Sequence, residues 1–414
     1  MTAISYIVRA TAMRLSNKHI LLGVSGGIAA YKIPELIRML VKAGAEVRVT
    51  TTRHALEFVT PLTLQTLSGH PVYSDVFAAI NEHATEHISL PEWADMMLVA
   101  PATANVLCKT AAGIADDALT TTLCSCAARK PILLAPAMND KMWENPAVQQ
   151  AITTLRTWQN VTVLEPDEGP LACGTCGKGR MPEPDFLFEA IEHVLTPKTL
   201  TNRRVLITAG PTQERIDPVR YLSNYSTGKM GFALAQECAR RGAEVTLVSG
   251  PTALQHYNIE GTLHRIDVRS AQEMYEATTQ AWPQTDIAIL CAAVADFAPS
   301  QEAADKIKKQ AGQTEMTLEL RTTPDIAATL GASKQKGQRL IGFALETRNE
   351  TVNAMHKLQS KQLDAIVLNS LRDAGAGFGT DTNRVTIFTC DGQTIALPLQ
   401  SKADIAAEII EALI

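Results

Sequence analysis

HILLGVSGGIAAYKIPELIRMLVKAG, residues 19–44, decides the fold of the first half of the chain. An apolar strand leads into a turn with glycines at 23, 26 and 27, and a helix follows that ends on Lys42-Ala43-Gly44. The next run, AEVRVT at 45–50, is rich in β-branched residues that favour a strand. Strand, helix and strand in this order predict a right-handed βαβ unit and a parallel sheet.

The same order of elements recurs in the second half. RRVLITAGPT at 203–212 reads as a strand with a glycine turn, and its helix follows at about 228–242. Further apolar runs typical of buried strands lie at 94–101, 130–136, 161–166, 285–296, 339–344 and 363–369. The sequence therefore predicts two doubly wound parallel-sheet α/β domains: a flavodoxin- or Rossmann-like one at 15–192 and a Rossmann-like one at 203–414, joined by a linker at 193–202.

The composition is typical of a globular enzyme. Of 414 residues, 46% are hydrophobic and 20% are charged, and the net charge of −5 gives no reason to expect nucleic acid or an anionic membrane as a partner. No apolar run reaches the ~18 residues that span a bilayer, and the first residues form no clean secretory leader. We expect a cytoplasmic protein whose eight cysteines are reduced.

Small and hydroxyl-bearing residues follow the strands of the first half. Ser25-Gly26-Gly27 opens a helix, a geometry that turns backbone N–H groups toward a phosphate. The next strand ends in Thr51 instead of the acidic residue of a dinucleotide fingerprint, which favours a single phosphate. Thr103 and Asn105 follow the strand at 94–101 and are expected at the same crevice. A tight turn without a ligand is the alternative.

Three further features of the first half are candidates for chemistry. His87 is a proton carrier at neutral pH, although a structural role, or His83 in its place, fits the composition equally well. Asn139 can hold a carboxylate or an amide, or it can cap a helix. The glycine-rich loop at 169–184 carries Cys173 and Cys176. A zinc site, a C-x-x-C redox pair and a substrate-closing flap with one reactive cysteine all compete there, and the flap fits best.

Two strand ends of the second half point to a nucleotide. The Ser226-Thr227-Gly228-Lys229 cluster opens a helix and offers donors to a phosphate, but it is not a Walker A loop, and a capped helix start is the alternative. Cys291-Ala292 ends a buried strand, where small residues let a flat base approach, and Asp296 can bond a base or a ribose.

Lysines in the second half supply the charge that such a nucleotide needs. In an extended segment Lys306 and Lys308 would share one face and could bracket a triphosphate, whereas a solvated basic edge is the alternative. Lys357 and Lys361 are spaced to lie on one helix face.

The motifs of residues 18–190 together resemble those of the flavin-dependent cysteine decarboxylases. They are most similar to the phosphopantothenoylcysteine decarboxylase half of the bifunctional proteins of coenzyme A biosynthesis. This resemblance rests on the series Ser25-Gly26-Gly27-Ile28-Ala29, His87, Pro136-Ala137-Met138-Asn139, Met142-Trp143, Ala172-Cys173-Gly174 and Gly179-Arg180-Met181. The resemblance implies an FMN site formed by Ser25, Gly26, Gly27, Thr51, Thr103 and Asn105.

Catalytic roles in this half also follow from the resemblance. His87 would be the histidine near the flavin, Asn139 would hold the substrate carboxylate, and Cys173 would return a proton or reducing equivalent from the flap. Glu86 and Ser89 stand where the family commonly has Gly and Glu.

Residues 203–414 resemble the phosphopantothenate–cysteine ligase half of the same proteins. The resemblance implies CTP as co-substrate, Mg²⁺ assistance, Asn224 holding the acyl group of an acyl-cytidylate, and Lys306 offsetting charge as pyrophosphate leaves. The implied CTP site consists of Cys291, Ala292, Asp296, Lys306, Pro324, Asp325, Ile326, Ala327, Phe343, Lys357 and Lys361. The metal ligands are not identified, and Phe297 stands where Tyr is common.

The resemblance predicts a bifunctional enzyme of coenzyme A biosynthesis. Its small-molecule substrates would be 4'-phosphopantothenate, cysteine and CTP, its product 4'-phosphopantetheine, and its assembly a homo-oligomer with trimeric decarboxylase and dimeric ligase units. Two alternatives belong to other classes: an NAD(P) oxidoreductase with a regulatory second domain, and a flavin-binding regulatory protein with an inert site. A flavin spectrum tests the first alternative, and a CO₂-release assay tests the second.

Overall fold

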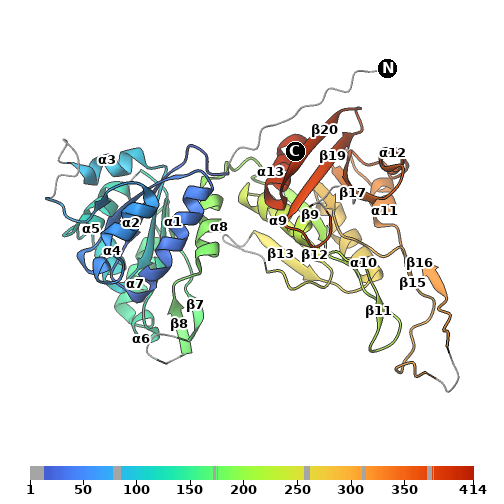
Figure 1. Ribbon diagram of the computed structural model, residues 1–414, viewed down its shortest axis with the longest axis horizontal. Helices are drawn as coiled ribbons and strands as arrows, with labels where there is room; N and C mark the ends of the chain where they lie inside the picture. Colours follow the sequence, from blue (N-terminus) through green and yellow to red (C-terminus); the bar gives the residue numbers. More distant parts are fainter. Residues whose placement is uncertain are drawn as a thin grey trace. The chain divides into compact units, whose positions relative to one another are not determined.

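The chain forms two compact units that meet between Thr196 and Pro197. The structure, a computed structural model, describes residues 14–77, 85–127, 129–170, 174, 176–255, 262–309, 314–370, 375 and 377–414 (Figure 1). The expected linker at 193–202 is divided between the units. Helix α8 (Pro184–Leu195) closes the N-terminal unit, whereas the Leu200 amide donates to Arg241 O at 2.8 Å within the C-terminal unit.

The N-terminal unit contains a six-stranded parallel sheet in the order β3-β2-β1-β4-β5-β6. Its strands are β1 (His19–Val24), β2 (Glu46–Thr51), β3 (Val72–Tyr73), β4 (Met96–Ala102), β5 (Ile132–Pro136) and β6 (Val161–Val163). Every residue of β4 and β5 is buried, as expected for a parallel sheet that is covered on both faces. The direction of winding reverses between β1 and β4, which makes the gap between their carboxyl ends the topological switch point.

Helices and short 3-10 turns cover this sheet. They are η1 (Ile28–Lys32), α1 (Ile33–Lys42), η2 (Arg53–Glu57), α2 (Pro61–Ser68), α3 (Glu86–Trp93), α4 (Ala104–Ala111), α5 (Ala118–Cys126), α6 (Asp140–Trp143), α7 (Pro146–Arg156) and α8. Leu107, Leu123 and Ile152 of α4, α5 and α7 form one core with Met97 and Leu134 of the sheet. Helix α1 packs against α2 and α8. Strands β7 (Asp167–Pro170) and β8 (Cys176–Arg180) form a separate antiparallel hairpin.

The C-terminal unit contains an eight-stranded sheet in the order β13-β12-β9-β14-β17-β18-β19-β20. Its strands are β9 (Arg204–Ala209), β12 (Glu244–Ser249), β13 (Leu263–Asp267), β14 (Ile287–Leu290), β17 (Arg339–Glu346), β18 (Ala365–Ser370), β19 (Thr382–Thr389) and β20 (Thr394–Ser401). The first six are parallel and repeat the relative order of the N-terminal sheet, so a second switch point lies between β9 and β14. This confirms the prediction of two doubly wound domains.

The sheet of the C-terminal unit departs from the prediction at one edge, because β19 and β20 are antiparallel and make the sheet mixed. The connection between them is a short turn containing Gly392 at φ 89°, and so short a connection can join only antiparallel strands. The apolar run at 285–296 also forms a shorter strand than expected, since β14 ends at Leu290.

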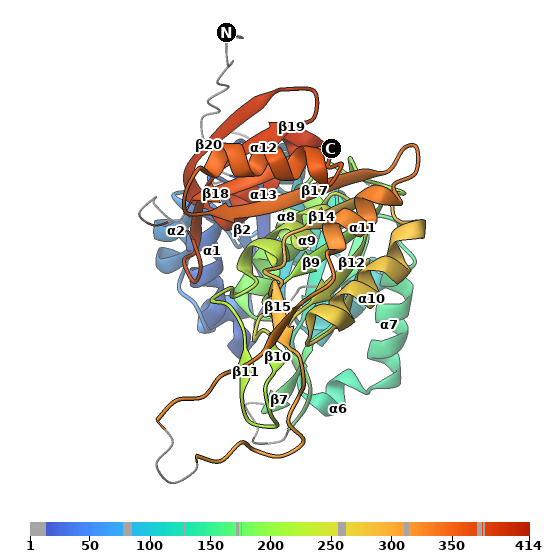
Figure 2. The same cartoon turned by 90° about the vertical axis from the view of Figure 1, so that its right-hand side faces the viewer.

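Helices cover both faces of this sheet. They are α9 (Lys229–Arg240), α10 (Ala271–Ala281), η3 (Trp282–Gln284), α11 (Ile326–Ala332), α12 (Glu350–Ser360) and α13 (Lys402–Leu413). Leu234 and Ile409 of α9 and α13 share one core, and Met274, Leu330 and Leu358 of α10, α11 and α12 share the other. Two hairpins, β10 (Glu214–Arg215) with β11 (Tyr221–Leu222) and β15 (Phe297–Pro299) with β16 (Leu320–Thr322), leave the sheet at the same end (Figure 2).

Two further observations bear on the setting of the protein. Within the described ranges, no helix is both long enough and apolar enough to cross a lipid bilayer. The seven cysteines that the structure describes are all free.

Candidate active sites

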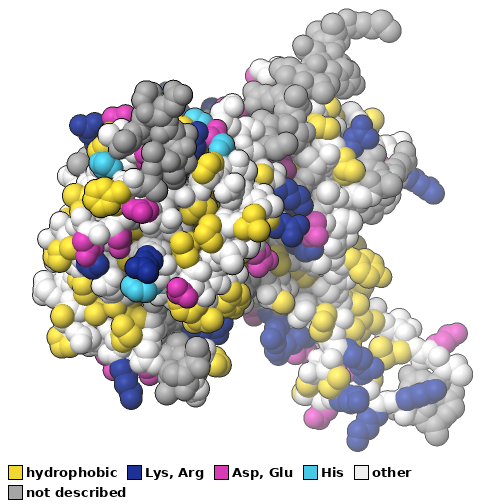
Figure 3. Space-filling model, turned by 60° about the vertical axis from the view of Figure 1, so that its left-hand side comes forward, with side chains coloured by type: hydrophobic (Ala, Val, Ile, Leu, Met, Phe, Trp, Pro, Cys, Tyr) yellow, Lys and Arg dark blue, Asp and Glu magenta, His cyan; other side chains and the backbone are white. Residues whose placement is uncertain are grey.

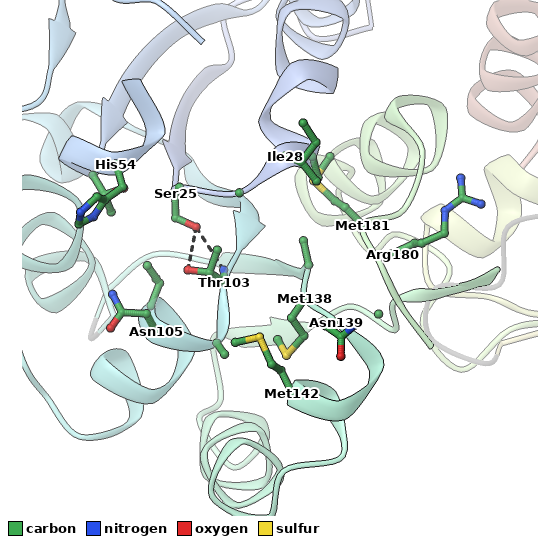
Figure 4. Close-up of a pocket in the computed structure, with 18 of the residues that line it drawn as sticks. Ser25, Ile28, His54, Thr103, Asn105, Met138, Asn139, Met142, Arg180 and Met181 are labelled. Carbon is green, nitrogen blue, oxygen red and sulfur yellow. Dashed lines mark hydrogen bonds between the residues drawn. The ribbon is translucent and has the colours of Figure 1, made fainter. Parts of the chain in front are cut away.

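A cavity of about 1150 Å³ opens at the switch point of the N-terminal unit. Its walls come from the turn after β1, from η2, from the start of α4, from the residues around Asn139 and from β8 (Figure 4). This volume slightly exceeds the ~300–1000 Å³ of ordinary small-molecule pockets. The cavity therefore has room for a cofactor together with a substrate.

Ser25 ties the two central strand ends of this cavity together. Its hydroxyl donates to Pro101 O at 2.7 Å. The same oxygen accepts a hydrogen bond from the Thr103 amide at 3.1 Å (Figure 4). The side chain is fully buried, so its bonding capacity is directed into the protein. Ser25 thus holds β1 against β4, and the backbone of the following glycine turn lines the cavity.

Gly26 is required by a close approach between two segments of the cavity wall. A Cβ at this position would lie 2.6 Å from His54 Cβ in η2, closer than real Cβ contacts allow. At Gly27 the added Cβ would lie 3.5 Å from Thr103 Cγ2, which is an ordinary contact. The turn therefore tolerates a side chain at 27 but not at 26.

Three consecutive hydroxyls lie at the end of β2. The side-chain oxygens of Thr50, Thr51 and Thr52 are buried and have no hydrogen-bond partner among the residues that the structure describes. Thr52 lines the cavity, whereas Thr51, which we predicted for the site, is fully buried and does not. Alternate residues of an extended segment face opposite sides, so a shift of one position decides which hydroxyl reaches the cavity.

Asn139 lines the cavity and also caps α6. Its Oδ1 accepts a hydrogen bond from the Lys141 amide at 3.0 Å, so the helix-cap interpretation and the site interpretation hold together. Strand β8 crosses the backbone beside it: the Met138 amide donates to Gly179 O at 2.9 Å, and a Cβ on Gly179, which has φ 152°, would overlap Met138 O. The β7–β8 hairpin is thereby fixed against the cavity wall.

Two predicted catalytic residues of this half are not brought into the cavity. His87 is half-buried in α3, does not line the cavity, and has a buried Nδ1 without a partner within the described ranges. Ser125 of α5 donates to the backbone oxygen of His87 at 2.6 Å. Cys173 lies outside the described residues; in the sequence it falls between β7 and β8.

Asn224 occupies the switch point of the C-terminal unit. Its Nδ2 donates to Ala293 O at 2.5 Å, and its Oδ1 accepts from the Ser226 amide at 3.0 Å. The Ala293 amide in turn donates to Gly210 O at 2.9 Å, which joins the loops that follow β9 and β14. The amide of Asn224 therefore spans the point at which these two strands diverge.

The two helix lysines predicted for a nucleotide are paired with carboxylates. Lys357 Nζ lies 2.7 Å from Glu346 Oε1, and Lys361 Nζ lies 3.0 Å from Asp325 Oδ2. Burial acts to raise the pKa of both carboxyls, but hydrogen bonds outweigh it and both pKa values are lowered. Asp325 also caps α11 by accepting from the Ala328 amide at 2.9 Å.

A buried carboxylate anchors the segment that contains Lys306. Asp217 Oδ2 accepts hydrogen bonds from Arg220 Nε at 2.9 Å and from the Ile307 amide at 3.1 Å, and Arg220 Nη2 donates to Ile307 O at 2.8 Å. The hydrogen bond from Arg220 is the main cause that holds the pKa of Asp217 far below its ordinary value. The side chain of Lys306 itself is exposed.

Comparisons with known proteins agree with this division. The Flavoprotein family model matches residues 8–196, and the DNA/pantothenate metabolism flavoprotein C-terminal domain model matches residues 200–414. The Coenzyme A biosynthesis bifunctional protein CoaBC of Bacillus subtilis is 49% identical over 96% of this chain and 97% of its own length. That of Escherichia coli is 44% identical over 94% and 95%. The chain belongs to the family of bifunctional coenzyme A biosynthesis proteins.

Membership of the CoaBC family confirms a bifunctional enzyme of coenzyme A biosynthesis with a flavoprotein half. It sets aside the NAD(P) oxidoreductase alternative. Among solved structures, the C-terminal domain of a Coenzyme A biosynthesis bifunctional protein CoaBC is 43% identical and covers 51% of this chain and 94% of its own, with a TM-score of 0.43.

The N-terminal cavity suits a flavin, the class of cofactor that the match to the Flavoprotein family implies. The glycine turn offers backbone N–H groups, and the buried Thr52 hydroxyl at the cavity wall lacks a partner in the described part of the chain. Arg53 and His54 follow at once and also line the cavity. We did not predict these two residues, although their position directly after the threonines at the end of β2 could have indicated that they line the cavity.

The remaining predicted nucleotide residues come from several segments of the C-terminal unit. Cys291 and Ala292 follow β14 and Phe343 lies within β17, whereas Pro324 precedes the cap of α11, and Ile326 and Ala327 begin that helix. Cys291 and Phe343 pack against the core under α9 and α13, and Ala292 packs against the opposite core. Burial raises the pKa of the Cys291 thiol to about 12, so it stays protonated at neutral pH. Asp296 is exposed at the start of the β15–β16 hairpin.

Two points remain for the predicted sites: the metal ligands, and the Asp217–Arg220 pair. Within the described ranges, no group of three or more His, Cys, Asp and Glu side chains is arranged to hold a metal ion. Asp217 and Arg220 were not predicted, and a carboxylate three residues before a guanidinium in a loop was the signal for them.

Proposed function

We propose that the C-terminal unit (203–414) joins cysteine to 4'-phosphopantothenate with CTP and that the N-terminal unit (15–192) decarboxylates the product to 4'-phosphopantetheine with FMN. The observation that carries this proposal is that each unit collects its polar and small residues at its own switch point. Two separate sites on one chain of this family suit two consecutive reactions.

In the N-terminal unit we assign FMN to the residues predicted from the sequence, with one addition. Gly26 and Gly27 supply backbone donors, and Ser25 and Thr103 hold the two strand ends together. The addition is Thr52, whose hydroxyl lines the cavity next to the predicted Thr51 in the sequence. Asn105 lines the cavity from the first turn of α4. When bound, FMN supplies the acceptor for the electrons of the substrate thiol.

The protein's own groups would then position and protonate the substrate. Asn139 orients the substrate carboxylate from the cavity wall, and Cys173, outside the described residues, returns a proton or reducing equivalent. His87 does not line the cavity of its own chain, so we assign it to the cavity of a neighbouring copy in a trimer.

Exposed apolar side chains support such a trimer. Figure 3 shows several hydrophobic patches on the front body, which is the N-terminal unit. Leu62 is 74% exposed in α2, and Ile88, next to His87, is 41% exposed. Contiguous apolar patches on a protein surface often mark protein contacts, whereas single exposed apolar side chains do not.

In the C-terminal unit we assign CTP to the predicted set at β14, β17, α11 and α12. Lys357 and Lys361 would exchange their carboxylate partners for phosphate oxygens, and Lys306 would offset the charge of the leaving pyrophosphate with Mg²⁺ assisting. Asn224 would hold the acyl group, and these units would form dimers.

The test of this function is incubation with 4'-phosphopantothenate, cysteine and either CTP or ATP, with pyrophosphate and CO₂ followed separately. We expect both products with CTP. An Asn139→Asp variant should release pyrophosphate but no CO₂, because only the second site is altered. No pyrophosphate with either nucleotide, or CO₂ release without prior ligation, would refute the assignment.

A further inference from the structure

Three buried hydroxyl groups lie in a row on one face of the N-terminal sheet. Thr50 of β2 and Tyr73 of β3 pair in register, so their side chains leave the same face of the sheet. Thr52 follows two positions after Thr50 in extended backbone and shares that face. All three side chains are buried, and their hydroxyls have no hydrogen-bond partner among the residues that the structure describes. We call these three side chains the hydroxyl row, and its Thr52 end lines the cavity.

Helix α3 covers the face from which the hydroxyl row projects. The guanidinium carbon of Arg48, two positions before Thr50, lies 4.3 Å from the ring centroid of Trp93 at the end of α3. Leu90, in the middle of this helix, shares a core with Tyr73, and α3 packs against α5 beside it (Figure 1). The helix therefore runs against the direction of the strands, and its first turn lies toward their carboxyl ends.

This first turn brings a carboxyl group to the hydroxyl row. Glu86 precedes Leu90 by four positions, which places it on the same face of α3, and it is only 5% exposed. Burial, followed by the charges of Glu86 and Asp75, raises the pKa of the Tyr73 phenol, so the phenol keeps its proton at neutral pH and can donate it in a hydrogen bond. Asp75 itself is exposed to solvent.

We propose that the hydroxyl row, joined by bound water, is a proton path between Glu86 and the cavity. The proposal rests on the proposed decarboxylation. A carboxylate that loses CO₂ must gain a proton in its place, so each turnover draws one proton from solution. The path would resupply the proton that the cavity gives to the product.

Proton movement along the row needs no other reactant. Each hydroxyl passes its own hydrogen to the acceptor on the cavity side and takes another from the Glu86 side, so one proton moves, every group regains its starting protonation state, and nothing is oxidised. Residues two apart on a strand are separated by about 6.6 Å and neighbouring strands by about 4.8 Å, spacings that one bridging water covers. Bound water commonly satisfies buried polar groups that lack a protein partner.

A Tyr73→Phe variant removes the phenol oxygen of the row and keeps the ring. With supplied 4'-phosphopantothenoylcysteine, we expect kcat for CO₂ release to fall about 10- to 100-fold and the solvent deuterium isotope effect on kcat to increase. KM, flavin absorbance and ligation should stay at their wild-type values. Glu86→Gln should behave in the same way, and Glu86→Asp should recover part of the loss.

Thr110→Val is the matched control. Thr110 is also buried, but its hydroxyl donates to Val106 O at 2.7 Å within α4, and its loss should change neither kcat nor the isotope effect. An unchanged kcat in Tyr73→Phe would overturn the path. So would a fall in kcat without a larger isotope effect, or one that accompanies loss of flavin, because either result indicates a purely structural role.

Thermal unfolding of Thr50→Val separates this proposal from the proposed function. A dry, unbonded hydroxyl destabilises the fold, so its replacement by a methyl group raises Tm, whereas the loss of a hydroxyl bonded to buried water lowers Tm. We expect a lower Tm. If the wild-type enzyme releases no CO₂, the decarboxylation is refuted, but a lower Tm of Thr50→Val still supports a hydrated row. A Tm equal to or above that of the wild type refutes the path even if CO₂ is released.

Discussion

The two units share the same relative order of six parallel strands, but their switch points are equipped differently. In the N-terminal unit a cavity stands open, with the buried hydroxyl of Thr52 at its wall lacking a partner in the described ranges. In the C-terminal unit the assigned groups already bond to protein: Asn224 to Ala293 O, and Lys357 to Glu346.

This difference teaches that topology fixes where a ligand binds but not how the site is prepared for it. The N-terminal site is prepared by shape, so a small change of volume should damage it most. The C-terminal site is prepared by hydrogen bonds and ion pairs that ligands must replace, so changes of charge or of donor should damage it most. The comparison would be wrong if steric variants damaged the C-terminal site most, or if variants of charge or donor damaged the N-terminal site most.

The largest expected effect is that of Asn224→Asp on the ligase. The substitution keeps the shape but removes the Nδ2 donor and sets a carboxylate oxygen against Ala293 O. We expect pyrophosphate formation to fall roughly 100- to 1000-fold. Decarboxylation of supplied 4'-phosphopantothenoylcysteine should be unchanged, and wild-type pyrophosphate rates in the variant would contradict the role of Asn224.

Gly26→Ala should be the most damaging steric substitution in the N-terminal site. Its new Cβ would overlap His54, whereas the Gly27→Ala control adds only an ordinary contact. We expect Gly26→Ala to lose flavin absorbance on purification and roughly 100-fold of its decarboxylation rate, with ligation intact. Equal flavin content in the two variants would show that the close approach is not limiting.

The Lys357–Glu346 pair provides a smaller test of the C-terminal site. Lys357→Ala should raise KM for CTP about 5- to 10-fold, because a phosphate partner is lost. Glu346→Gln should lower that KM about twofold, because Lys357 no longer has to leave a carboxylate. Steady-state kinetics with varied CTP measure both, and a rise of KM in both variants would mean that the pair serves structure alone.

The smallest effect concerns the stability of the C-terminal unit against acid. The pKa of Asp217 is held below its ordinary value of 3.8, chiefly by Arg220, so ionised Asp217 stabilises the fold above that value. Asp217→Asn should therefore lower Tm by a few degrees at pH 7. The gap to wild type should close as the pH falls below 3.8 toward the folded-state pKa.

Thermal unfolding followed between pH 2 and pH 7 measures this gap. Asp305→Asn is the control, because Asp305 is an exposed carboxylate that makes no hydrogen bond or ion pair within the described part of the chain. A pH-independent difference between wild type and Asp217→Asn would contradict the role of the depressed pKa.

Sequence reasoning predicted the sheets because their evidence is local. Apolar runs, glycine turns and helix ends recur in order, and the two switch points follow from that order. Thr51 was predicted where Thr52 lines the cavity, since period-2 alternation is uncertain by one residue at a strand end. The roles of Asp217 and Arg220 were not predicted. Their partner, Ile307, lies about ninety residues away in the sequence, and no local pattern connects residues so far apart.

The continuous chain at Thr196 and Pro197 determines the ratio of the two kinds of active site in the cell. Because both units lie on one polypeptide, every completed chain delivers one site of each kind. Unequal expression cannot make one site more abundant than the other, so the balance between the two steps is set by turnover rates alone. Selection on the flux through this pair of reactions would act on kinetic constants, not on gene dosage of either half.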